Sequence, residues 1–159
     1  MKKLEILKRL YSDETITISA VDGSKTIFNS EDVFKSWIDS AFKDWGLNKP
    51  DQKTPEIKTQ VYEMAKDADY SQIFGLLNDD LDKLCLTQHQ IVEFCVNNQK
   101  YLRGDGWGNF FLFKVDGKYY VACVAVSPDG LCVDVYRFED NFVWYAEFAF
   151  RVVVPQLEA

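Results

Sequence analysis

The stretch Phe110–Phe138, FFLFKVDGKYYVACVAVSPDGLCVDVYRF, decides the fold. Two tight-turn signals, Asp116-Gly117 and Pro128-Asp129-Gly130, divide it into three runs that are rich in aromatic and β-branched residues. Such runs, separated by turn residues, are typical of antiparallel strands joined as hairpins. A third turn signal at 139–141 leads into Phe142–Val154, so we expect a four-stranded antiparallel meander.

The half of the chain before residue 104 is predicted to be mainly helical. An Asp22-Gly23 turn between 15–19 and 26–28 predicts one small β-hairpin. Apolar residues recur at helical spacing in five segments, which are 4–11, 30–45, 55–68, 71–77 and 87–95. A strand over 56–64 is the alternative to the third helix, but the cap signal Thr54-Pro55-Glu56 favours the helix. We therefore expect an α+β fold in a single domain, 1–159, with a helical lobe (1–103) packed on a sheet lobe (104–159).

Composition and charge exclude several classes of protein. With 47% hydrophobic and 27% charged residues among 159, the bulk of the chain is not disordered. A net charge of −7 without a basic stripe argues against nucleic-acid binding, and the longest apolar run is too short for a membrane span. Glu5, Lys8 and Arg9 interrupt any signal peptide, so we expect a cytoplasmic protein with free thiols at its four cysteines.

Two segments resemble known ligand loops but lack essential features. Gly104–Asn109 is glycine-rich, yet it follows a predicted helix and precedes a strand, which is the wrong order for a phosphate loop. Asn78–Lys83 resembles the start of a calcium loop but lacks its glycine, and His89 stands where the closing glutamate belongs. His89 is expected to be exposed or to cap its helix. We therefore expect neither a metal site nor a cofactor.

The turn positions also predict which side chains share a face of the meander. If Asp116-Gly117, Asp129-Gly130 and Asp140-Asn141 are the central residues of hairpin turns, Val133 pairs with Val126 and Phe148. One face is then apolar apart from Arg137 near its edge, and we expect the helices to cover it. The other face carries the side chains of Tyr119, Val121, Asp134, Tyr136, Phe138, Tyr145, Glu147 and Arg151.

On this second face Asp134 is predicted to lie directly opposite Glu147. Two facing carboxylates repel, so either Arg151 or Arg103 bridges them or one is protonated. The second arrangement is that of a general acid/base pair, with Tyr136 and Tyr145 beside it as stacking surfaces. The first is a solvated outer face without chemistry.

The sequence favours a non-enzymatic, acidic protein-interaction domain over an enzyme. Its expected binding residues are Trp107, Tyr136, Tyr145 and Arg151, with Trp107 acting either as a binding anchor or as a lid on the core. The expected partner is a basic protein, which the chain binds as an inhibitor or immunity-type protein binds its target. The other expected partner is a second copy of the chain. The alternative is a small hydrolase or carbohydrate-binding enzyme that uses Asp134 and Glu147.

Overall fold

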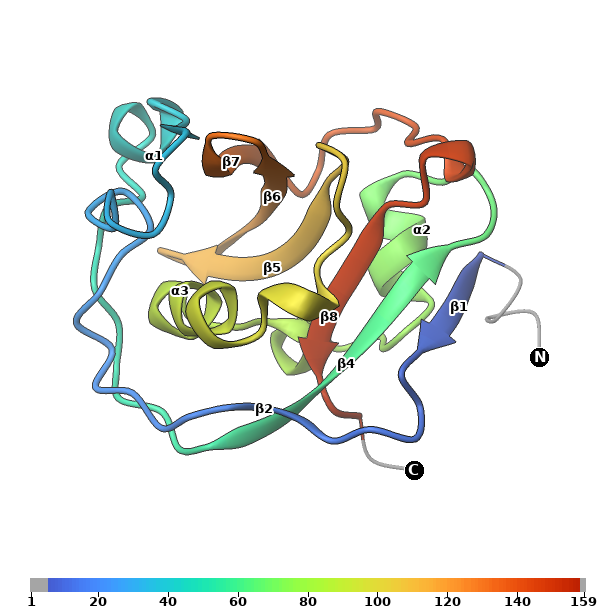
Figure 1. Ribbon diagram of the computed structural model, residues 1–159, viewed down its shortest axis with the longest axis horizontal. Coiled ribbons are helices and arrows are strands. Elements are labelled where there is room, and N and C mark those ends of the chain that lie inside the picture. The colour runs from blue at the N-terminus through green and yellow to red at the C-terminus, as the bar shows by residue number, and fades with distance from the viewer. Residues whose placement is uncertain (1–5, 158–159) are drawn as a thin grey trace.

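The computed structural model describes residues 6–157, which form an α+β fold around one eight-stranded mixed sheet (Figure 1). The sheet order is β1-β4-β8-β5-β6-β7-β3, and β2 also pairs with β4. The strands are β1 (Leu7–Leu10), β2 (Ile16–Ile18), β3 (Trp37–Ile38), β4 (Ile57–Met64), β5 (Asn109–Val115), β6 (Lys118–Ser127), β7 (Gly130–Arg137) and β8 (Arg151–Pro155). The α-helices are α1 (Ala41–Asp44), α2 (Tyr70–Gly75) and α3 (Gln88–Asn97), and the 3₁₀ turns are η2 (Leu81–Leu84), η3 (Gln99–Tyr101) and η4 (Ala146–Phe148).

Two of the three predicted hairpins of the C-terminal half are confirmed. Val115 pairs with Lys118 across the Asp116-Gly117 turn, as predicted. Ser127 pairs with Gly130, so the β6–β7 register differs by two residues from the prediction. Because side chains alternate with a period of two, this even shift leaves every β6 and β7 side chain on its predicted face.

The prediction of a mainly helical N-terminal half is wrong, and β4 shows why. The segment predicted as helix 55–68 forms this strand, which pairs with β1, β2 and β8. Residues 59–62 are buried in succession because both faces of the sheet are covered. A helix cap contributes about 1 kcal/mol, whereas strands on both sides of β4 satisfy its backbone hydrogen bonds.

Two further N-terminal predictions fail because β4 supplies a distant partner. The predicted helix 4–11 is strand β1 over its described part, while Leu4 lies outside the described residues. The predicted hairpin 15–28 is absent because β2 pairs with β4 rather than with 26–28. Neither segment contains the information that would identify its partner.

The predicted helix 30–45 is interrupted by a carboxylate that bonds the backbone. The Asp39 N–H donates to the carbonyl oxygen of Val133 at 2.9 Å, which extends the parallel pairing of β3 with β7. The Asp39 carboxylate accepts from the N–H groups of Ala41 at 2.9 Å and Val135 at 3.2 Å. Aspartate competes with helical hydrogen bonding in this way, so only α1 remains helical.

The helices near 71–77 and 87–95 are confirmed, and both begin at a capping box. Asp69 accepts from the N–H of Gln72 in α2, and Thr87 accepts from the N–H of Gln90 in α3. The longest described helix, α3, has ten residues, and no described helix has the length and apolar character required to cross a bilayer.

The predicted fourth strand of the meander, Phe142–Val154, is wrong over most of its length. Its last residues form β8, which pairs parallel with β5 and antiparallel with β4 instead of with β7. Residues 138–150 form a long connection that contains η4, and Ala149 has a left-handed backbone with φ of 53°. We call residues 138–150 the β7–β8 connection.

Apolar side chains cover the sheet on both faces. On one face α3 packs with Ile27, Phe34 and Phe42 against alternate residues of β5, β6 and β7. On the other face α2 packs with Trp144 and Phe150 of the β7–β8 connection. The second sheet face is therefore part of the core rather than a solvated surface.

All four cysteines are free, and burial raises the pKa of the Cys123 thiol.

His89 is buried, contrary to the prediction that it is exposed or capping. Its Nδ1 accepts a hydrogen bond of 3.0 Å from the N–H of Gly23, whose φ is +85°. A Cβ on Gly23 would overlap the backbone carbonyl groups of Asp51 and Gln52. Gly46 also has a positive φ of +72°, but a Cβ there would meet open space.

These two glycines provide a matched test of the packing around His89. We expect Gly46→Ala to lower the free energy of unfolding by about 1 kcal/mol, which is the cost of a left-handed residue. Gly23→Ala adds a backbone clash, so this variant should lose about 3 kcal/mol or more of its free energy of unfolding. Urea unfolding of the two variants measures the difference. Equal losses would show that the chain around Gly23 accommodates a side chain.

Candidate functional site

Asp134 and Glu147, the predicted carboxylate pair, do not face each other. Asp134 lies on β7 opposite Cys123 of β6, whereas Glu147 lies in η4 outside any strand. The separation follows from the β7–β8 connection, which leaves the sheet where the prediction continued a strand. The hydrolytic alternative therefore loses the geometry on which it depends.

Asp134 has a different carboxylate in its surroundings, that of Asp39. Burial, and then the charge of Asp39, raise the pKa of Asp134 above its usual range. Asp39 accepts two backbone hydrogen bonds that hold β3 and α1 against β7, while Asp134 accepts none from the described residues. This arrangement fixes one sheet edge and leaves Asp134 as an uncompensated, half-buried charge.

Two predicted binding residues, Tyr136 and Arg151, serve the core. The Tyr136 ring packs against Trp144, with 5.3 Å between ring centroids, and is half-buried. Arg151 donates to the carbonyl oxygen of Tyr101 at 2.7 Å and to the hydroxyl of Tyr11 at 3.1 Å. Its side chain is only 16% exposed, so it is positioned to tie β8 to the preceding loops.

The other two predicted binding residues, Trp107 and Tyr145, come together on the surface. Trp107 stacks on Phe148, with ring centroids 4.1 Å apart and planes 16° from parallel. Tyr145 meets the same Phe148 ring edge-on, with 6.5 Å between centroids. Trp107 is still 37% exposed, so it covers Phe148 with one face and presents the rest of its ring to solvent.

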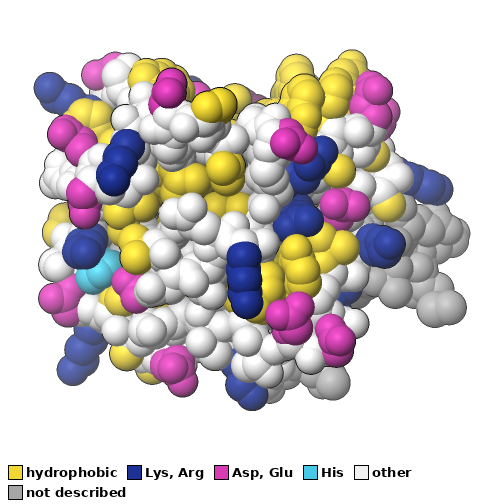
Figure 2. Space-filling model, viewed as in Figure 1, with side chains coloured by type: hydrophobic (Ala, Val, Ile, Leu, Met, Phe, Trp, Pro, Cys, Tyr) yellow, Lys and Arg dark blue, Asp and Glu magenta, His cyan; other side chains and the backbone are white. Residues whose placement is uncertain are grey.

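Sequence reasoning missed two neighbours of this pair, Phe142 and Val143. They are 58% and 44% exposed, and Tyr145 is 50% exposed. We define the aromatic patch as Trp107, Phe142, Val143, Tyr145 and Phe148. Figure 2 shows apolar side chains gathered along the upper edge of the molecule, over the β7–β8 connection. The signal in the sequence was the apolar run FVWY directly after a turn, because an irregular segment cannot bury every side chain of such a run.

The aromatic patch is mounted on a well-anchored backbone. Trp144, between the exposed residues, is buried against Phe110 and Phe150 with ring centroids 4.9 Å and 5.2 Å away. The backbones of Trp144 and Ala68 exchange two hydrogen bonds, of 2.9 Å and 3.2 Å. These contacts hold the neighbouring side chains outward without a large entropic cost on binding.

Carboxylates outnumber cations in the segment that carries most of the aromatic patch. The β7–β8 connection contains Glu139, Asp140 and Glu147 and no lysine or arginine. Next to Trp107, Asp105 lies 3.4 Å from the guanidinium of Arg103. Along the chain the patch thus has an acidic rim, which Arg103 interrupts by donating to the carbonyl oxygen of Phe148 at 3.4 Å. Among the described residues no group of three or more His, Cys, Asp or Glu is placed to hold a metal ion.

A scan against protein-family models and searches of curated proteins and of solved structures find no match to this chain.

The environment of Asp134 predicts an unusual response to pH. Because the folded state raises the pKa of Asp134, ionisation of this group costs stability as the pH rises through that range. We expect Asp134→Asn to melt at a higher temperature than the wild type at about pH 7, with the gain shrinking as the pH falls towards about 4. Glu147→Gln is the control. Thermal melts of the three proteins should give it the same melting temperature as the wild type. A lower melting temperature for Asp134→Asn at neutral pH would contradict this account.

Proposed function

We propose that this chain is a protein-interaction domain that binds a basic protein through the aromatic patch. The observation that carries the proposal is that Phe142, Val143 and Tyr145 are 44% to 58% exposed on an anchored connection, with Trp107, 37% exposed, stacked on Phe148 of the same connection. Exposed apolar patches with polar rims mark interaction sites, and tryptophan and tyrosine are enriched among the residues that dominate binding. The role that sequence reasoning gave to a whole sheet face is thereby assigned to the β7–β8 connection.

Charge determines which kind of partner suits the patch. The acidic rim and a net charge of −7 favour a partner whose apolar pocket is surrounded by lysine and arginine. Binding of a second copy through the same surface is disfavoured, because a two-fold contact would place Glu139, Asp140 and Glu147 against the same carboxylates. This is the arrangement of an inhibitor or immunity-type protein that meets a basic target.

Site-specific photocrosslinking in the source cells identifies the partner. We place a benzophenone amino acid at Phe142 and, as the control, at Val96, which is 49% exposed on α3 on the other face of the sheet. The proposal expects an adduct with a basic protein from position 142 and none from position 96. An adduct with a second copy of the chain, or no adduct specific to 142, would overturn it.

The purified partner then provides a quantitative prediction. We expect Phe142→Ser to weaken its affinity by about tenfold or more, as for a residue at the centre of an interface, and Val96→Ser to leave it unchanged. Raising the salt concentration from about 0.05 M to about 0.5 M should weaken binding by roughly tenfold. Titration calorimetry measures both effects. An affinity that neither substitution nor salt alters would show that the partner binds elsewhere.

A further inference from the structure

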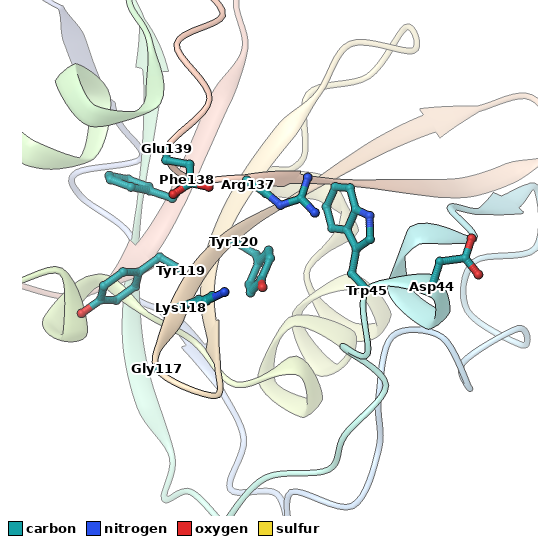
Figure 3. A pocket seen from close by; sticks show the side chains of 9 residues that line it. All are labelled: Asp44, Trp45, Gly117, Lys118, Tyr119, Tyr120, Arg137, Phe138 and Glu139. Atoms are coloured by element: carbon teal, nitrogen blue, oxygen red, sulfur yellow. The ribbon is translucent and has the colours of Figure 1, made fainter.

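A pocket of about 550 Å³ opens where the β5–β6 hairpin and the end of β7 meet the end of α1 (Figure 3). None of the residues of the aromatic patch lines it. Its walls are formed by Asp44, Trp45, Gly117, Lys118, Tyr119, Tyr120, Arg137, Phe138 and Glu139. Pockets of roughly 300–1,000 Å³ are typical of small-molecule sites.

Sheet register brings three polar groups to one side of this pocket. Lys118 and Tyr120 are two residues apart on β6, so their side chains leave the same face of the strand. Arg137 of β7 pairs directly with Tyr120, which places its side chain on that face as well. Figure 3 shows Tyr120 between the Lys118 and Arg137 side chains. Arg137 is the charge that the sequence placed at the edge of an otherwise apolar face.

Trp45, which follows α1, completes the pocket by holding Arg137 in place. The guanidinium carbon of Arg137 lies 4.0 Å from the centroid of the Trp45 ring, within cation–π distance. The Arg137 guanidinium donates to no described group, so its planar fork is available to a ligand group that accepts two parallel hydrogen bonds.

The two cations of the pocket have no anionic partner among the described residues. Lys49 lies within 4.0 Å of the Asp116 carboxylate and Lys114 within 4.0 Å of the Asp82 carboxylate, but Arg137 and Lys118 have no described carboxylate at that distance. Asp44 and Glu139 line the pocket without pairing with them. In Figure 3 the Asp44 carboxylate points away from Tyr120 and Lys118. Exposed lysines and arginines without a carboxylate partner are common on the described part of this chain, so what distinguishes Arg137 and Lys118 is that both line one pocket.

We propose that this pocket binds a small organic anion in which a phosphate or carboxylate group is attached to an aromatic ring. The Arg137 guanidinium and the Lys118 ammonium hold the anionic group, and the Tyr120 hydroxyl, which bonds no described group, donates to it. The ring packs against Trp45 on that same face of the sheet, while Tyr119 and Phe138 line the pocket from positions that face the other side. The inference is independent of the aromatic patch, so either proposal can fail alone.

Indole N–H signals provide a direct measurement, because the chain has only four tryptophans. We titrate the ¹⁵N-labelled protein with phenyl phosphate and with benzoate, and assign the Trp45 signal with Trp45→Phe. The expected result is a saturable shift of the Trp45 signal with at least one of the two anions, while the signals of Trp37 and Trp107 stay in place. The anion that binds more tightly shows whether the pocket prefers a phosphate or a carboxylate group.

Substitutions decide whether the named cations cause the binding. Arg137→Gln and Lys118→Gln should each weaken the binding of phenyl phosphate or benzoate by about tenfold. Arg137→Lys should also weaken binding, because lysine lacks the planar fork of arginine. Lys100→Gln is the control, since Lys100 lies over Tyr101 outside the pocket. Glu139→Gln should tighten binding by removing a repelling charge. An equal response to benzylamine, a shift that does not saturate, or unchanged affinity in the Arg137 and Lys118 variants would overturn the proposal.

Discussion

The insertion of β8 between β4 and β5 is the interaction on which the rest of the structure depends. Val152 pairs with Tyr62 on one side and with Phe110 on the other, which joins the two halves of the chain in one sheet. Because β5 and β6 lie between β7 and β8 in the sheet, the intervening residues 138–150 must leave the sheet. The exposed aromatic side chains lie on that excursion, so the candidate interaction surface is a consequence of the strand order.

Burial of both sheet faces explains where the many aromatic residues go. Tyr70 and Phe74 of α2, with Trp144 of the β7–β8 connection, cover the face that would otherwise be solvated. A sheet covered on both faces gives unbroken apolar runs rather than an alternating pattern. The aromatic residues that remain exposed after both faces are covered therefore need an explanation beyond packing.

The two proposed sites use opposite charges at different places on an acidic chain. The β7–β8 connection, which carries most of the aromatic patch, contains carboxylates but no lysine or arginine. Beside Trp45, Arg137 and Lys118 line the same pocket, and neither pairs with a described carboxylate. Local charge, rather than the net charge of −7, therefore determines what each surface can bind.

The sequence by itself determined the parts of this protein that depend on neighbouring residues. The Asp116-Gly117 turn, the Thr87 cap and the faces of β6 and β7 were predictable, because each rests on contacts within a few residues or on strand alternation. It also placed Trp107 and Tyr145 among the candidate binding residues, with Trp107 as either an anchor or a lid, and placed Arg137 near the edge of a sheet face. Only the tertiary structure decided that 57–64 is a strand, that Asp134 and Glu147 are apart, and that Phe142 is exposed. Those outcomes depend on which distant strands pair, and backbone hydrogen bonds, which are the same for every residue except proline, do not specify their partners.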